Sequence, residues 1–224
     1  MQGALDGSLV IFDLDGTLVD TAADLAAAMN EAIAADGLEP VPLAAVRHLV
    51  GHGARAMMLQ AYALAGHPPD RVDIEARMER FLAHYLAHIA DHSAPFPDAV
   101  AQIDALRADG AAVAICTNKR EAWARALFDA LGLSHRFAAV TGADTVGIAK
   151  PDPRPVLAAL AGTGRSKAVF VGDSDTDIRA AKAAGMPCIA ALFGYGPLDL
   201  VGEAFAVFSA YEEAPALICR AARL

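Results

Sequence analysis

Residues 10–17 read Val-Ile-Phe-Asp-Leu-Asp-Gly-Thr. A short apolar run, typical of a buried strand, ends in two carboxylates two residues apart. Asp13 is expected at the end of the strand and Asp15 just beyond it, in a turn. Two acids this close repel each other unless a cation or a proton lies between them. The stretch therefore predicts metal binding together with acid–base chemistry, although an Asp- and Gly-rich turn after a strand is also common without function.

The composition narrows the class of protein. The chain has 224 residues, of which 55% are apolar, and a formal net charge of -9, so it is long enough for one large domain or two modest ones. The acidic balance argues against a nucleic-acid or anionic-membrane partner. No stretch approaches 18 uncharged apolar residues, the first residues lack the pattern of a signal peptide, and three scattered cysteines are typical of reduced thiols. We therefore expect a cytoplasmic protein with no membrane partner.

Strand-like and helix-like segments alternate along most of the chain. Strands are expected at 9–13, 111–116, 137–140, 168–171 and 187–192, and helices at 119–131, 153–161 and 176–184. The three helices are followed by Gly132, Gly162 and Gly185 at the expected C′ position, and Asp152-Pro153 forms a helix start. This alternation predicts an α/β fold, a Rossmann-like parallel sheet with helices on both faces.

Residues 20–91 break the alternation, because they show helical spacing and no strand signal. We interpret them as a helical cap domain inserted after the first strand. The α/β core is then discontinuous, formed by residues 1–19 and 92–224. Two linkers, near 16–20 and 92–97, would join the cap to the core.

More polar residues are expected where other strands end. They are Thr117 and Asn118, Lys150, and Asp173 with Asp177. Taken singly, each has an ordinary explanation as a helix cap, a solvated cation or an acidic helix start. Parallel strands, however, direct ligands to the space beyond their carboxyl ends, at the point where strand order reverses. Together with Asp13 and Asp15 they would supply a nucleophile, an acid–base group, a hydroxyl, a cation and carboxylate ligands for a metal ion. All of these groups would lie at the carboxyl ends of the parallel strands.

The order and content of these segments resemble the haloacid dehalogenase-like hydrolase superfamily, specifically its phosphatases with a helical cap after the first strand. The resemblance covers essentially the whole chain. It rests on Asp-x-Asp-Gly-Thr at 13–17 combined with Thr117, Lys-Pro at 150–151 and Gly-Asp-x-x-x-Asp at 172–177. The segments at 49–55, 116–119 and 150–153 are similar to those of the phosphoglycolate phosphatase subfamily.

The resemblance implies a role for each acid. Asp13 would attack phosphorus and become an aspartyl phosphate that water then hydrolyses. Asp15 would protonate the leaving alkoxide and then activate water. Mg²⁺ would be held by the carboxylates of Asp13 and Asp173 and the main-chain carbonyl of Asp15, which is an all-oxygen site. Asp177 would hold a water molecule bound to the metal.

The remaining roles concern phosphate and the rest of the substrate. Thr117 and the amides after it would bind phosphate, and Lys150 would balance charge between phosphate and the acids. Asn118 and Lys119 would make secondary contacts. In the predicted cap, Arg55 would bind a substrate carboxylate, or it is a surface cation in a helix–helix turn. The spacing of His84, His88 and His92 permits a transition-metal site, but a solvated helix face is the preferred interpretation.

These features predict a Mg²⁺-dependent phosphatase for a small phosphorylated metabolite, with 2-phosphoglycolate as the expected substrate. A sugar-phosphate hydrolase, a pyrophosphate hydrolase and a phosphomutase of the same superfamily stay open as alternatives. A phosphoacceptor signalling module is the non-enzymatic alternative, but it explains neither Asp15 as an acid nor a large cap. The sequence does not define an oligomeric state.

Overall fold

The computed structural model describes residues 3–67 and 73–224. In this part of the chain, six strands form one parallel sheet in the order β5-β4-β1-β6-β7-β8. The strands are β1 Ser8–Phe12, β4 Ala112–Cys116, β5 Ala139–Thr141, β6 Lys167–Gly172, β7 Cys188–Ala191 and β8 Ala206–Phe208. The five predicted strands are confirmed within a few residues at each end, whereas β8 was not predicted. It is a short edge strand with one buried residue, so its sequence carries little apolar signal.

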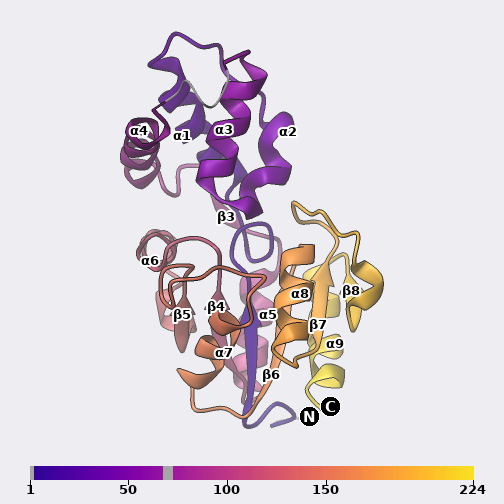
Figure 1. The fold of residues 1–224 in the computed structure, drawn as a ribbon. Coiled ribbons are helices and arrows are strands. Elements are labelled where there is room, and N and C mark those ends of the chain that lie inside the picture. Colours follow the sequence, from indigo (N-terminus) through magenta and orange to yellow (C-terminus); the bar gives the residue numbers. More distant parts are fainter. Residues whose placement is uncertain (1–2, 68–72) are drawn as a thin grey trace.

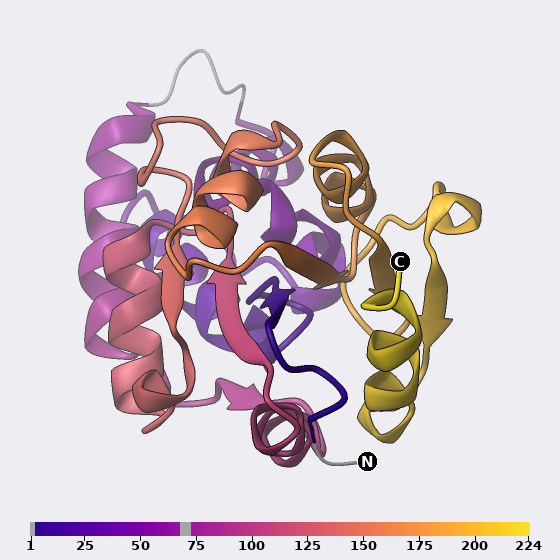
Figure 2. The same cartoon turned by 90° about the horizontal axis from the view of Figure 1, so that it is seen from below.

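Helices cover both faces of the sheet, as the alternation of strands and helices predicted (Figure 2). Leu9 and Ile11 of β1 pack in one cluster with α7 (Arg154–Ala161) and α8 (Asp175–Ala183). Val10 and Phe12 point to the opposite face, whose cluster includes residues of α5 (Ala99–Ala108), α6 (Glu121–Ala130) and α9 (Ala214–Ala221). The central strand is therefore buried on both sides, which explains its continuous apolar run.

Two details of the predicted helix ends are wrong. Gly162 has φ −62°, and the left-handed residue is Gly164, because the amides of Thr163 and Gly164 donate to the carbonyls of Leu160 (3.1 Å) and Ala161 (3.3 Å) and the turn continues. Helix α7 begins at Arg154 with Pro153 as N-cap, one residue later than predicted, while Asp152 accepts from the Arg154 amide (2.9 Å). Gly132 and Gly185 adopt the positive φ expected after a helix.

A group of helices interrupts the α/β alternation between β1 and α5 (Figure 1). It contains α1 Ala22–Ala34, α2 Leu43–Val46, the 3₁₀ turn Arg47–His52, α3 Ala54–Leu64 and α4 Ile74–Ala87. The segments entering and leaving the group form a two-stranded antiparallel ribbon of β2 (Val19–Asp20) and β3 (Ala94–Pro95), which was not predicted. In Figure 1 the helices lie beyond the carboxyl end of β1. Within the described residues, no helix is both long and apolar enough to cross a bilayer.

Candidate active site

The site lies where β1 ends. Strand β1 is central, and the strands that follow it in sequence extend toward both edges of the sheet, so its carboxyl end is the switch point at which ligands bind in such folds. The Asp13 amide donates to the carbonyl of Val171 (2.9 Å), which holds the residue in line with β6. Burial raises the pKa of Asp13 to about 8, with Lys150 opposing this shift and Asp177 and Asp173 adding to it.

Asp173 follows β6 and is tightly enclosed. Its carboxylate accepts from the Thr17 hydroxyl (2.8 Å) and from the Tyr195 amide (2.7 Å). A Cβ atom at Gly16, where φ is +83°, or at Gly194 would lie within 2.6 Å of this carboxyl group. Both positions therefore require glycine so that the backbone can approach the acid. Burial raises the pKa of Asp173 to about 7.

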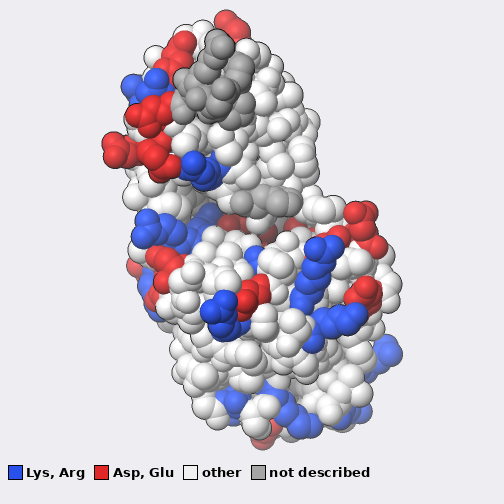
Figure 3. Space-filling view, in the orientation of Figure 1, with Lys and Arg blue, Asp and Glu red and all other residues white. Residues whose placement is uncertain are grey.

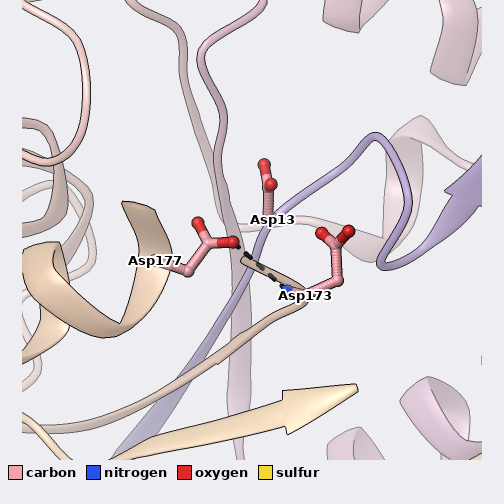
Figure 4. Close-up of side chains that lie close together, drawn as sticks. All are labelled: Asp13, Asp173 and Asp177. Carbon is pink, nitrogen blue, oxygen red and sulfur yellow. Dashed lines mark hydrogen bonds between the residues drawn. The ribbon is translucent and has the colours of Figure 1, made fainter. Parts of the chain in front are cut away.

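Asp13, Asp173 and Asp177 lie around one space (Figure 4), and their ligand atoms lie within 4.8 Å of one another. Asp177 already uses both oxygens: one accepts from Lys150 Nζ (2.7 Å) and the other from the Ser174 hydroxyl (2.7 Å). Asp173 also accepts a hydrogen bond at each oxygen, but its donors are a hydroxyl and an amide, and no cation among the described residues pairs with it. Asp13 and Asp173 are thus buried oxygen donors, and burial raises the pKa of both. This donor set fits a hard divalent cation.

Lys150 is the cation nearest to Asp13. Its ammonium group lies 2.9 Å from Asp13, 2.7 Å from Asp177 and 2.8 Å from the carbonyl of Cys116. Burial disfavours the charged form, but Asp13 and Asp177 outweigh it and raise the pKa of Lys150. Asp177 also accepts from the amides of Asp173 and Ser174 (both 3.2 Å), so its orientation is fixed by its own helix start. Asp177 therefore holds the charged ammonium group of Lys150 beside Asp13.

Asp15 is bound by two residues from distant segments of the chain. Its Oδ1 accepts from Lys119 Nζ (2.8 Å) and from the Thr21 hydroxyl (2.6 Å). Lys119 is buried, and Asp15 together with Tyr85 outweighs that burial and raises the pKa of Lys119. Sequence reasoning gave Lys119 only a secondary role and missed Thr21. The position of Lys119 two residues after Thr117, at the same strand end, was the available signal.

Thr117 lies buried at the end of β4, and its hydroxyl accepts from the amide of Lys119 (3.1 Å). The side chain of Asn118 pairs with the main chain of Lys150 through two hydrogen bonds, of 2.8 and 3.1 Å. Asn118 therefore holds the segment that carries Lys150, while Thr117 lines the cavity beside Asp13.

The structure does not bring the other predicted residues to this site. Arg55 is exposed and forms an ion pair with Glu75, and it does not line the cavity. Helix α4 ends at Ala87, so His92 does not continue the helical face of His84 and His88. The rings of His84 and His88 stack with centroids 4.5 Å apart, and His88 contacts Asp91 (2.7 Å).

A cavity of about 70 Å³ lies between the carboxyl ends of the strands, here called the sheet edge, and the helical group. The sheet edge contributes polar groups: Asp13, Asp15, Thr117, Asn118, Lys119, Lys150, Ser174, Thr176 and Asp177. The helical group contributes mainly apolar ones: Leu25, Val50, Gly51, Gly53, Ala54, Met57, Phe81 and Tyr85, while Arg120 and Trp123 of the α6 region complete the wall. The arrangement can hold an anion and a cation together at the polar end and enclose a small group under the apolar end.

Comparison with known proteins defines the family. A family model described as "Haloacid dehalogenase-like hydrolase" matches residues 10–191, so the chain belongs to this family. It is similar to the phosphoglycolate phosphatase of Caulobacter vibrioides, with 46% identity over 209 residues that cover 92% of this chain and 88% of that protein. The phosphoglycolate phosphatase of Agrobacterium fabrum is 46% identical over 195 residues, covering 86% and 84% of the two chains. The crystal structure of a "predicted phosphoglycolate phosphatase" from Haemophilus somnus matches with a TM-score of 0.86 at 26% identity, covering 93% of this chain and 96% of that chain.

Proposed function

We propose that the protein is a Mg²⁺-dependent phosphatase that hydrolyses 2-phosphoglycolate to glycolate and phosphate through an aspartyl phosphate on Asp13. The observation that carries this proposal is the position of Asp13, buried at the end of the central strand between Lys150 and Asp173. A carboxylate held this way divides a difficult displacement into two easier steps. The relatives named phosphoglycolate phosphatase support the choice of substrate.

The principal polar residues of the sheet edge have separate tasks in this reaction. Asp13 attacks phosphorus in line with the leaving oxygen, while Lys150 and Thr117 hold the phosphate oxygens. Asp15 donates a proton to the leaving alkoxide and later accepts one from the attacking water. Mg²⁺, bound by Asp13, Asp173 and the carbonyl of Asp15, would neutralise charge on the phosphate.

The helical segment 20–91 acts as a cap in this proposal, and the β2–β3 ribbon is its connection to the core. The cavity that the cap closes is small, which suits a compact phosphoester and excludes water from the reaction. Opening of the cap through the ribbon would admit substrate and release product. Asp15 with its two partners, and the enclosed cavity, favour an enzyme over a phosphoacceptor module.

A small phosphorylated metabolite in the cytoplasm is the partner we propose. Basic and acidic side chains are interspersed on the face in Figure 3, which does not favour a nucleic-acid surface there. The three cysteines are free thiols, as expected in a reducing compartment.

A panel of phosphorylated metabolites tests the proposal. Phosphate release is measured with Mg²⁺ for 2-phosphoglycolate, several sugar phosphates and pyrophosphate, with Asp13→Asn as the inactive control. We expect phosphoglycolate to have the highest kcat/KM. If kcat/KM for a sugar phosphate or pyrophosphate exceeds that for phosphoglycolate about tenfold, a difference of about 1.4 kcal/mol, the proposed substrate is wrong. The proposed phosphatase activity would still hold.

A further inference from the structure

One buried polar atom in the described part of the chain has no hydrogen-bond partner: the hydroxyl oxygen of Tyr85. Tyr85 lies on α4, is 1% exposed, and lines the cavity that contains Asp13 and Asp15. Leaving a buried hydroxyl unpaired is unfavourable, and native proteins rarely tolerate it. An unpaired hydroxyl at the wall of a substrate cavity is therefore explained most simply by a partner that arrives with the substrate.

The ring of Tyr85 has tasks that do not need the hydroxyl. It stacks against Phe81, with centroids 6.0 Å apart, and Lys119 Nζ lies 5.0 Å from its centroid. Phenylalanine would give the same packing and a similar cation–π contact. The hydroxyl also lies close to the Lys119 ammonium group, and this contact contributes to the raised pKa of Lys119. Because an ammonium group can only donate, the hydrogen of the Tyr85 hydroxyl still needs an acceptor.

Tyr85 lies near charges of both signs, namely the Lys119 ammonium group, which is paired with Asp15, and the carboxylates of Asp15 and Asp24. The rest of the cavity adds groups that favour an anionic ligand. Lys119 and Arg120 line the same cavity, and so does the first turn of α3, which begins at Ala54 and has no side-chain cap. A helix start carries partial positive charge and presents main-chain amides. The rest of the wall formed by the helical group is apolar, so a ligand group beneath it finds few other polar partners.

We propose that Tyr85 determines specificity by donating a hydrogen bond from its hydroxyl to the carboxylate of the leaving group, beside the first turn of α3. This inference rests on the proposed function, since it assigns the recognition of the non-phosphate end of the same substrate. Tyr85 would act in binding and would leave the chemistry at Asp13 unchanged. The competing role is structural: the hydroxyl could orient Lys119, and through it Asp15, for every substrate alike.

Tyr85→Phe removes the hydroxyl alone and separates the two roles. The variant and the wild type are assayed with 2-phosphoglycolate and with ethyl phosphate, in which a methyl group replaces the carboxylate. We expect kcat/KM for phosphoglycolate to fall about tenfold or more, as for the loss of a hydrogen bond to a charged group, mainly through KM. For ethyl phosphate, kcat/KM should fall at least about fivefold less than for phosphoglycolate, because no hydrogen bond to the substrate is lost.

Tyr62→Phe is the matched control. Tyr62 is also 1% exposed and lies in the same helical group, but its hydroxyl is bonded to Asp36 and it does not line the cavity. Its variant should retain the wild-type ratio of the two substrates. Circular dichroism confirms that both variants are folded.

Two results would overturn the role of Tyr85 while leaving the proposed function intact. One is an equal loss with both substrates in Tyr85→Phe, which would show that the hydroxyl acts through Lys119. The other is no loss with either substrate. A wild type that does not prefer phosphoglycolate over ethyl phosphate would overturn the proposed substrate itself, and the inference with it.

Discussion

The carboxyl edge of the sheet and the helical wall opposite it differ in how their polar side chains are satisfied. At the sheet edge, Lys150, Asp177 and Asp173 are each held by two or more hydrogen bonds or ion pairs. On the helical wall, the hydroxyl of Tyr85 is buried without a hydrogen-bond partner. Under the proposed function, the sheet edge would thus be organised in advance for phosphate and metal, whereas the contacts of the wall would be completed by the substrate.

This difference suggests a division of labour. Groups that must be held within a fraction of an ångström for phosphoryl transfer come from a rigid sheet. Groups that select the substrate come from helices joined to the core by a short ribbon. Substitutions at the sheet edge should therefore affect all substrates alike, and substitutions on the wall should affect some more than others.

The largest effect is expected from Asp13→Asn. The amide has nearly the same shape but is not a nucleophile, so kcat should fall by about three decades or more for every substrate. Steady-state phosphate release measures it, with thermal melting to show that the fold is kept. Activity within about tenfold of wild type would remove Asp13 from the nucleophilic role.

Asp15→Asn should come next, with a loss of about two to four decades in kcat, typical of a missing acid–base group. The substitution also leaves the buried ammonium of Lys119 without its ion-pair partner, so a lower melting temperature is expected. The assay is therefore run where circular dichroism shows a folded variant. Full activity across the pH range would show that Asp15 does not transfer the proton.

The metal prediction concerns stability as well as activity. Burial raises the pKa of Asp13 to about 8 and that of Asp173 to about 7, above their ordinary value of 3.8. The folded protein then binds more protons than the unfolded one between about pH 4 and 8, so its stability should fall as pH rises through that window. Thermal melting in EDTA at pH 5.5 and pH 8 checks this.

Added Mg²⁺ should raise the melting temperature at pH 8 and restore activity, and Asp173→Asn should weaken both responses. Asp177→Asn is the comparison, because Asp177 is bonded to Lys150 and Ser174 and need not contact the metal. A melting temperature that does not respond to Mg²⁺ would contradict the metal site at Asp13 and Asp173.

The smallest effect is expected from Arg55→Ala. Its side chain is 56% exposed and its partner Glu75 is 75% exposed, so the ion pair should contribute less than about 1 kcal/mol to stability. In the arrangement seen here, KM for phosphoglycolate should change by less than about twofold. A KM increase of about tenfold that is specific for phosphoglycolate would instead support the sequence-based prediction that Arg55 binds the carboxylate.

Much of the fold could be predicted from the sequence, because continuous apolar runs indicate buried strands and glycines indicate where helices end. The same patterns located Asp13, Lys150 and Asp173, since parallel strands bring their carboxyl ends together. The contacts of Tyr195 and Thr21 were not predictable in this way. Tyr195 reaches Asp173 through its amide and Asp20 through its hydroxyl (2.6 Å), contacts between distant segments that no local pattern encodes.

The helical wall was the least predictable part. Helical spacing identified buried residues such as Tyr85, but spacing cannot show whether a hydroxyl finds a partner. Arg55 was selected because it follows a Gly-His-Gly segment, and Gly51 and Gly53 of that segment do line the cavity. The direction of its side chain depends on Glu75 of α4, which lies 20 residues away in the sequence.

The most direct test is to trap the phosphoryl group on the protein. Wild-type enzyme with Mg²⁺ and excess 2-phosphoglycolate is quenched in acid within milliseconds, digested, and analysed by mass spectrometry, with Asp13→Asn treated identically. The proposed mechanism predicts one phosphoryl group on the peptide that contains Asp13, at Asp13 itself, and none in the variant. A phosphoryl group on another residue, or rapid turnover with no phosphorylated protein at any time point, would contradict it.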